Sequence, residues 1–269
     1  MTQVMTRAQT RTNFHSSRLI RILADLAVIE TVEPGAVFAE KLALWVDFAD
    51  AIQLCAVHNT GVACGAMGGA MGEAMGEAKG DAIGDEFART RLGLENSITQ
   101  SCTPGAGKTP LQRPTPLLPT QPSGLPLEAA IPYEPYRRFH LAHQRDMELN
   151  IRPLRSKARA ALAQASPALR QLADLDATLD GILMEREKKL LATVPTLLEK
   201  RFKHLRNAHQ QSVAASQQAD NPDTWMKPGG WLARFCNELQ TVLLAELDLR
   251  LQPTAGLIEA CNDQKLKHA

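Results

Sequence analysis

Residues 166–205 read SPALRQLADLDATLDGILMEREKKLLATVPTLLEKRFKHL, and this stretch decides the fold class. Ser166 followed by Pro167 indicates a helix start, because serine caps helix N-termini and proline is tolerated at the first helical position. A branched apolar residue then recurs every 11 residues, at Leu172, Leu183, Val194 and Leu205. Eleven residues complete three helical turns, so these side chains follow one helix face. The stretch predicts a long amphipathic helix of the coiled-coil type, with a kink at Pro195.

The sequence on both sides of this stretch also has helical periodicity. Upstream, apolar residues recur at helical spacing between residues 137 and 149, and Pro153 predicts a kink or a restart. Downstream, a glycine pair precedes a helix that is expected to start at Trp231 and to end at Pro253, with a short helix around residues 257–258. Residues 131–269 are therefore predicted to form a C-terminal helical domain, a bundle of long helices.

The centre of the chain is low in complexity. Residues 65–84 read GAMG, GAMG, EAMG, EAKG and DAIG, and a glycine at every fourth position weakens a helix by roughly 1 kcal/mol each relative to alanine. Between residues 104 and 126, seven of 23 residues are proline, which favours an extended chain. Residues 61–130 are therefore predicted to be a flexible, disordered Gly/Ala/Met- and Pro-rich spacer that folding does not need.

The N-terminal part is predicted to form a helical hairpin within residues 1–60. Ser16 or Ser17 can cap a first helix whose apolar face begins at Leu19. A break at residues 33–35 (EPG) separates it from a second helix over residues 38–52. The two helices are expected to pair antiparallel and to dock on the C-terminal helices. The predicted fold class is all-α.

Bulk composition predicts a cytoplasmic protein. The net charge of +1 gives no overall attraction to nucleic acid or membrane. The five cysteines include no C-x-x-C pair, which fits a reducing compartment. The N-terminal residues lack the apolar core of a secretion signal. Residues 51–72 carry no charge, but their polar residues and glycines make them poorly hydrophobic, so no membrane span is predicted.

Motifs for chemistry are weak throughout the chain. Cys55, His58 and Cys64, or the pair His140 and His143, offer zinc-binding side chains without the paired spacing of a structural site. Residues 102–109 (CTPGAGKT) lack the first glycine of a phosphate-binding loop and precede prolines that forbid its helix. Residues 113–119 match a proline-helix ligand, as any proline-rich linker can. No cofactor, metal, small-molecule ligand or catalytic residue is predicted, and the protein is predicted not to be an enzyme.

Two blocks resemble a known family. Residues 136–148 (YRRFHLAHQRDME) and 243–253 (LLAELDLRLQP) are similar to the hallmark blocks of an uncharacterised bacterial family, a domain of unknown function. The resemblance covers residues 14–58 and 133–262 and implies no known activity. It associates the family with genes for envelope proteins of the proton-channel and peptidoglycan-binding kind, which suggests an assembly factor.

Two functional hypotheses follow from these patterns. The first is a non-enzymatic helical scaffold or adaptor that supports an envelope-associated assembly and binds a protein partner or a second copy through its helix faces. The second is a nucleic-acid-associated helical protein, because residues 133–219 hold 15 Lys/Arg against nine Asp/Glu and the basic block spans residues 137–206. The candidate partner-contact residues are Tyr136, Arg137, Arg138, His140, His143 and Arg145.

Overall fold

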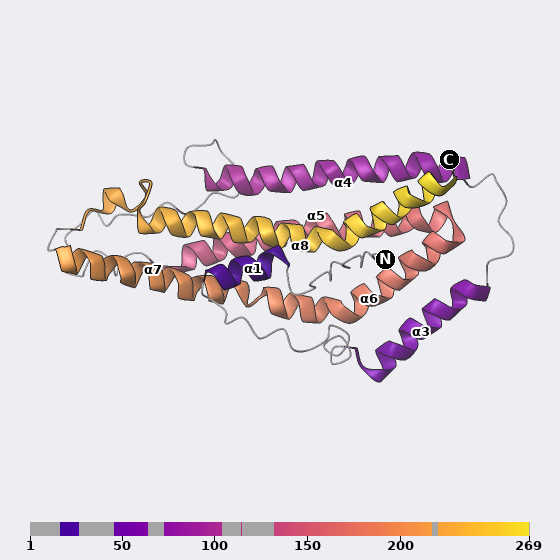
Figure 1. Cartoon of the computed structure of the whole chain (residues 1–269), viewed down its shortest axis with the longest axis horizontal. Coiled ribbons are helices and arrows are strands. Elements are labelled where there is room, and N and C mark those ends of the chain that lie inside the picture. Colours follow the sequence, from indigo (N-terminus) through magenta and orange to yellow (C-terminus); the bar gives the residue numbers. More distant parts are fainter. Residues whose placement is uncertain are drawn as a thin grey trace, which may run out of the picture.

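The computed structural model describes residues 17–26, 46–63, 73–103, 114, 132–216 and 220–268. These residues form helices and hold no β-strand, so the all-α prediction is confirmed (Figure 1). The helices are α1 (Arg18–Asp25), α3 (Phe48–Ala63), α4 (Glu73–Cys102), α5 (Glu134–Ala165), α6 (Pro167–Leu191), α7 (Val194–Ser216) and α8 (Trp231–His268), with a short 3₁₀ turn, η2 (Pro222–Thr224), before α8.

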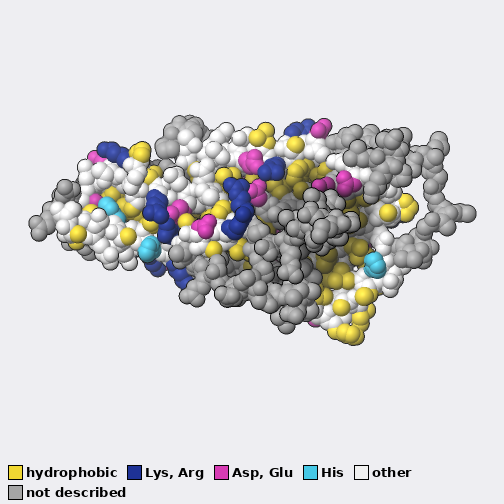
Figure 2. Space-filling view, viewed as in Figure 1, with side chains coloured by type: hydrophobic (Ala, Val, Ile, Leu, Met, Phe, Trp, Pro, Cys, Tyr) yellow, Lys and Arg dark blue, Asp and Glu magenta, His cyan; other side chains and the backbone are white. Residues whose placement is uncertain are grey.

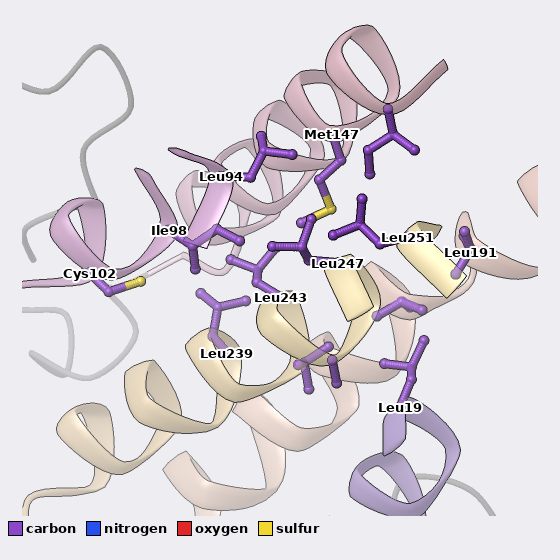
Figure 3. Packing of buried hydrophobic residues seen from close by; sticks show 14 of the residues in the cluster. Leu19, Leu94, Ile98, Cys102, Met147, Leu191, Leu239, Leu243, Leu247 and Leu251 are labelled. Carbon is purple, nitrogen blue, oxygen red and sulfur yellow. The ribbon is translucent and has the colours of Figure 1, made fainter. Parts of the chain in front are cut away.

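Helices α4, α5 and α8 pack on one another and form the centre of the bundle, and α6 and α7 return along α5 and α8. Figure 3 shows how they meet: Leu94 and Ile98 of α4 and Met147 of α5 point toward the leucines of α8. The α8 leucines at this seam, Leu239, Leu243, Leu247 and Leu251, recur in steps of four, and all are at most 2% exposed. Steps of four residues keep these side chains on one side of the helix, which explains why α8 lies inside the bundle.

Aromatic rings close one end of the bundle. Phe202 of α7 and Phe235 of α8 lie edge to face with ring centroids 5.0 Å apart, and Tyr136 of α5 contacts Phe235 in the same way at 5.5 Å. The Tyr133 hydroxyl donates a hydrogen bond to the carbonyl oxygen of Pro195, 2.6 Å away. Edge-to-face rings are favourable beyond the area that they bury, so this cluster ties α5, α7 and α8 together.

Several helix boundaries agree with the sequence. The Ser17 and Ser166 hydroxyls accept hydrogen bonds from the backbone N–H of Ile20 and Leu169, and these bonds start α1 and α6. Where a kink was expected at Pro195, the predicted long helix divides into α6 and α7, and Pro195 occupies the second position of α7. A proline there lacks only a hydrogen bond that the first helical turn does not make.

Two prolines that were expected to interrupt helices do not. Helix α5 continues through Pro153, and α8 continues through Pro253, so no separate helix begins at residues 257–258. Both prolines are exposed to solvent. Water can therefore bond the carbonyl that each proline leaves without its helical partner, and burial of the opposite helix face offsets the remaining cost.

The prediction of a flexible spacer is wrong over residues 73–102. These residues form α4, which packs on α5 and α8, and Ile83, Leu94, Ile98 and Cys102 are buried in the core. The physical reason is that an ordinary apolar stripe begins at Ile83, in the last copy of the glycine-rich repeat, and supplies the burial that the glycines lack. The remaining parts of the predicted spacer, apart from residues 61–63, 103 and 114, lie outside the described residues.

The predicted antiparallel N-terminal hairpin also differs from the structure. Helices α1 and α3 both dock on C-terminal helices, as expected, but on different ones: α1 lies on α8, whereas α3 lies on α6 at the edge of the bundle (Figure 1). Residues 27–45 lie outside the described residues, so the first part of the predicted second helix is not described. The two helices therefore extend different parts of the C-terminal bundle.

The three predicted units, residues 1–60, 61–130 and 131–269, share one hydrophobic core. Buried residues of α1, α4 and α5 to α8 form a single cluster. The 11-residue seam lies on two helices, with Leu172 half-buried on α6 and Leu205 buried on α7. Within the described part of the chain, no helix has an apolar stretch long enough to cross a bilayer.

Candidate functional site

A buried polar cluster lies where α5, α8 and the end of α6 meet. Glu246 is fully buried on the inner face of α8. The Gln144 side-chain amide of α5 donates to both oxygens of the Glu246 carboxylate, at 2.9 and 3.0 Å, and lies 3.2 Å from the carbonyl oxygen of Leu191 at the end of α6. Arg250, one helical turn beyond Glu246, donates to the same carboxylate at 2.8 and 3.0 Å. The carboxylate is therefore charge-paired and hydrogen-bonded, as a buried acid must be.

Burial and pairing act in opposite directions on Glu246. Removal from water raises the pKa of the Glu246 carboxyl, and the Arg250 charge with the Gln144 and Arg250 hydrogen bonds opposes that rise. Breaking the pair would leave one charge uncompensated inside the bundle. The cluster consequently fixes how α5, α8 and α6 lie relative to one another.

His140 completes this cluster as a neutral ring. Its Nε2 atom lies 3.4 Å from a Glu246 carboxylate oxygen, but the geometry is not that of a hydrogen bond, and neither ring nitrogen has a hydrogen-bond partner among the described residues. Burial lowers the pKa of His140 to about 3, and the positive charge that His143 gains on protonation and that of Arg250 act in the same direction. Because Arg250 already pairs with the carboxylate, we assign His140 as neutral at pH 7 in spite of the short distance to Glu246.

His143 links α5 to α4. Its Nε2 atom lies 3.0 Å from the Ser101 hydroxyl oxygen, and that hydroxyl donates to the carbonyl of Ile98 at 2.9 Å. A hydroxyl has one proton to donate, so its oxygen accepts from His143 and the imidazole carries its proton on Nε2. Burial lowers the pKa of His143 to about 4, with Asp146 acting in the opposite direction.

A groove of about 530 Å³ opens beside this cluster, between α5 and α6. Gln144 and Arg250 are among its lining residues. Its apolar lining consists of Leu141, Met147, Ile151, Met184, Leu191 and Ala192. The charged residues around it are Arg145, Arg152, Arg155, Lys188, Glu148, Asp180, Glu185 and Glu187. An apolar lining under a rim of both charge signs is typical of a site for an amphipathic segment.

The structure separates the six predicted partner-contact residues. Tyr136, His140 and His143 are at most 1% exposed and belong to the core, so no partner reaches them on the folded surface. Arg137 and Arg138 are exposed on the other side of α5, where both lie within ion-pair distance of Glu134. Of the six, Arg145 alone lines the groove. The partner-contact role of the three arginines stays a prediction.

Intramolecular ion pairs neutralise part of the basic block. Arg155 and Arg159 of α5 each bind both Asp176 and Asp180 of α6, with four ion pairs of 2.6 to 2.8 Å. Lys157 pairs with Glu86 of α4 at 2.6 Å. A phosphate backbone would have to displace these carboxylates, so Arg155, Lys157 and Arg159 give little support for the nucleic-acid alternative.

Sequence comparison places this architecture in a family. A family model described as Protein of unknown function (DUF3348) matches residues 5–263. The chain belongs to this family. No curated protein and no solved structure matches the chain.

The DUF3348 match includes α4, which lies outside the ranges 14–58 and 133–262 covered by the sequence resemblance. It also contains site residues that no sequence motif indicated, namely Gln144, Glu246 and Arg250. A signal for Glu246 was present, because this glutamate interrupts the apolar face formed by Leu239, Leu243 and Leu247. A charged residue inside an apolar stripe indicates a buried pair. Neither Gln144 nor Met184 carried such a signal, because the groove forms only when α5 and α6 pack together.

Metal binding has no site in the described residues. No three His, Cys, Asp or Glu side chains within the described ranges lie close enough to share an ion. His140 and His143 lie beside Glu246 and Ser101, whereas Cys55 and His58 lie on the distant α3. Cys64, the third candidate ligand, lies outside the described residues.

Proposed function

We propose that this DUF3348 protein is a non-enzymatic, cytoplasmic helical adaptor that binds an amphipathic helix of a partner protein in the groove between α5 and α6. The observation that carries the proposal is the groove itself, with its apolar lining and its rim of both charge signs. Such a surface is complementary to a helix that has one apolar stripe flanked by charged residues. An envelope-associated assembly is the process we propose for it, on the basis of the family resemblance.

The burial of the acid–base groups supports a non-enzymatic role. Glu246 and His140 are fully buried. The Glu246 carboxylate already accepts hydrogen bonds from Arg250 and Gln144. A general acid or base needs to come within hydrogen-bond distance of its substrate. The accessible groups of the groove are instead long charged side chains on a rim, which suit recognition of another polypeptide.

The test compares two substitutions on the same helix. Leu141 lies in the groove and is 39% exposed, whereas Leu149 lies outside it and is 67% exposed. Leu141→Glu places a charge on the apolar lining, and Leu149→Glu is the matched control. Full-length wild type and both variants, tagged at the chromosomal locus, are purified with their bound proteins and quantified.

A groove partner is a protein that wild type and Leu149→Glu retain and Leu141→Glu loses. With the purified partner, we expect Leu141→Glu to weaken binding at least about tenfold in titration calorimetry, because a charge would be buried without a pair. Arg145→Glu should weaken binding as well and make it less sensitive to salt. The proposal fails if no bound protein distinguishes Leu141→Glu from its control while both variants keep wild-type helicity.

A further inference from the structure

The charged residues around the groove come from two helices, and each helix supplies mainly one sign. Helix α5 contributes three arginines and one glutamate, namely Arg145, Arg152, Arg155 and Glu148. Helix α6 contributes three acids and one lysine, namely Asp180, Glu185, Glu187 and Lys188. The α5 residues, which we call the α5 wall, therefore carry a net charge of +2, and the α6 residues, the α6 wall, carry −2.

One ion pair joins the two walls. Arg155, the last α5 residue of the lining, binds Asp180, the first α6 residue, at 2.8 Å. The other six charged side chains of the walls are exposed, and they form no ion pair with any residue that the structure describes. Most of the charge around the groove is therefore available to an occupant.

This separation of signs differs from the surface elsewhere. Figure 2 shows basic and acidic side chains interspersed over the described part of the visible face. Asp248, for example, lies 2.6 Å from Arg18 and 3.3 Å from Arg91. Around the groove, unpaired arginines and unpaired glutamates instead lie on opposite sides of an apolar lining.

Glu187 shows that the α6 wall acts on the inside of the groove. Burial raises the pKa of the Glu246 carboxyl, and the negative charge of Glu187 acts in the same direction. Arg250, which opposes this rise, is already bound to Glu246 at 2.8 Å and does not pair with Glu187. A cationic side chain on an occupant of the groove would supply the missing partner of Glu187.

We propose that the groove selects a partner helix with two oppositely charged flanks, an acidic flank along the α5 wall and a basic flank along the α6 wall. This polarity rests on the adaptor function proposed above and names the chemistry of the partner. A helix with the same sign on both flanks would meet like charges on one wall. Turning a helix end for end in the groove exchanges its flanks, so the two walls also fix the direction of the partner helix.

The probes are three synthetic helical peptides of about 18 residues, or about 27 Å, with the same leucine stripe. The first has glutamates on one flank and lysines on the other, the second has glutamates on both, and the third has lysines on both. Each is titrated with the full-length protein and followed by fluorescence anisotropy. At low salt the Glu/Lys peptide should bind at least about tenfold more tightly than either single-sign peptide, and high salt should reduce this difference.

A charge reversal on the protein should change the preferred peptide. Glu185→Lys with Glu187→Lys makes both walls basic, so the Glu/Glu peptide should become the tightest of the three, by at least about tenfold over the Lys/Lys peptide. Glu259→Lys with Asp263→Lys is the matched control. It makes the same change in net charge at exposed positions of α8 outside the groove, and it should keep the wild-type order.

The outcomes separate this polarity from the adaptor function. Equal affinity for all three peptides, lost together in Leu141→Glu, would overturn the polarity and leave a groove that binds helices. A Glu/Lys peptide that does not bind at up to about 200 µM would also overturn it. An unchanged order in the Glu185→Lys, Glu187→Lys variant would show that the α6 wall does not select the partner. In each case the proteins that wild type and Leu149→Glu retain still decide the adaptor function.

Discussion

At the scale of single residues, the glycines of this chain have opposite roles. Gly230 precedes α8, and a Cβ there would clash with the backbone carbonyl oxygens of Trp225 and Thr224. The Trp225 carbonyl is engaged, since it accepts a hydrogen bond from the Ala233 N–H at 2.9 Å, and the Trp225 side chain is 1% exposed. Gly93 lies inside α4, where an added Cβ meets nothing within 4 Å.

Alanine substitutions should therefore move stability in opposite directions. Gly230→Ala should lower the free energy of unfolding by about 2–3 kcal/mol, because buried backbone has to shift. Gly93→Ala should raise it by about 0.5–1 kcal/mol, because alanine favours the helix without a clash. Urea denaturation followed by circular dichroism measures both changes. Equal effects of the two substitutions would show that close approach at Gly230 is not the reason for its glycine.

At the scale of the helix, α4 is the element whose role differs most from expectation. Ile98, in its last turns, is 1% exposed and points toward α8 in Figure 3. Ile98→Ala should cost about 2–5 kcal/mol of unfolding free energy, because it leaves a cavity between helices. Leu92→Ala, at an exposed position of the same helix, should change stability by no more than about 0.5 kcal/mol. The denaturant midpoints of the two variants measure this difference. If Ile98→Ala is as stable as Leu92→Ala, α4 does not belong to the core.

The signals that predicted helices correctly were local. Ser166 with Pro167 marks the start of α6, and the apolar period after Trp231 marks the inner face of α8, because capping and periodicity depend on neighbours within a turn or two. The same local reasoning failed at Pro253, where solvent exposure of the proline decided the outcome. The local reasoning also failed at α4, because the glycine-rich repeat indicated a spacer although an apolar stripe begins at Ile83.

The candidate site was less predictable than the helices. The histidines of α5 are recognisable in the sequence, but whether a histidine faces solvent or another helix depends on which helices surround it. His143 acquires its partner from α4, 42 residues away, and Glu246 acquires Gln144 from a helix 102 residues away. The groove depends in the same way on the pairing of α5 with α6. Such neighbours follow from tertiary packing, which a single sequence does not display.

At the scale of the whole molecule, the two buried histidines make stability depend on pH. The pKa of His140 is about 3 and that of His143 about 4 in the folded protein, whereas a histidine in an unfolded chain titrates near 6.5. The unfolded chain therefore binds more protons between these values. Stability is full above about pH 6.5 and falls as the pH drops toward 4, by about 1.4 kcal/mol per pH unit for each histidine.

Two carboxylates modify this dependence. The raised pKa of Glu246 acts in the opposite direction, because its protonation favours the folded state as the pH falls. The lowered pKa of Asp176 adds to the loss of stability only at lower pH, below its unfolded value. Between pH 6.5 and about 5 the histidines should therefore dominate the slope.

Removing one histidine should flatten the slope. Urea denaturation at a series of pH values gives the slope of the unfolding free energy against pH. His143→Gln should reduce this slope between pH 6.5 and 5 by the equivalent of about one proton. Glutamine is chosen because its side-chain amide can still form a hydrogen bond with Ser101. Asn207→Gln, at an exposed position of α7 without a titratable group, is the control and should keep the wild-type slope. The same slope for all three proteins would show that His143 does not titrate on unfolding.

The contact between α1 and α8 joins segments that lie far apart in the sequence. Leu19 and Leu23 bury themselves against the bundle, and Arg18 reaches Asp248 across 230 positions of sequence. A ribosome adding about 5–20 residues per second needs roughly 10–50 s to make that length. During this interval α1 has been made but its docking surface on α8 has not. The apolar face of α1 therefore leaves the exit tunnel uncovered, and completion of the core has to wait until α8 has been made.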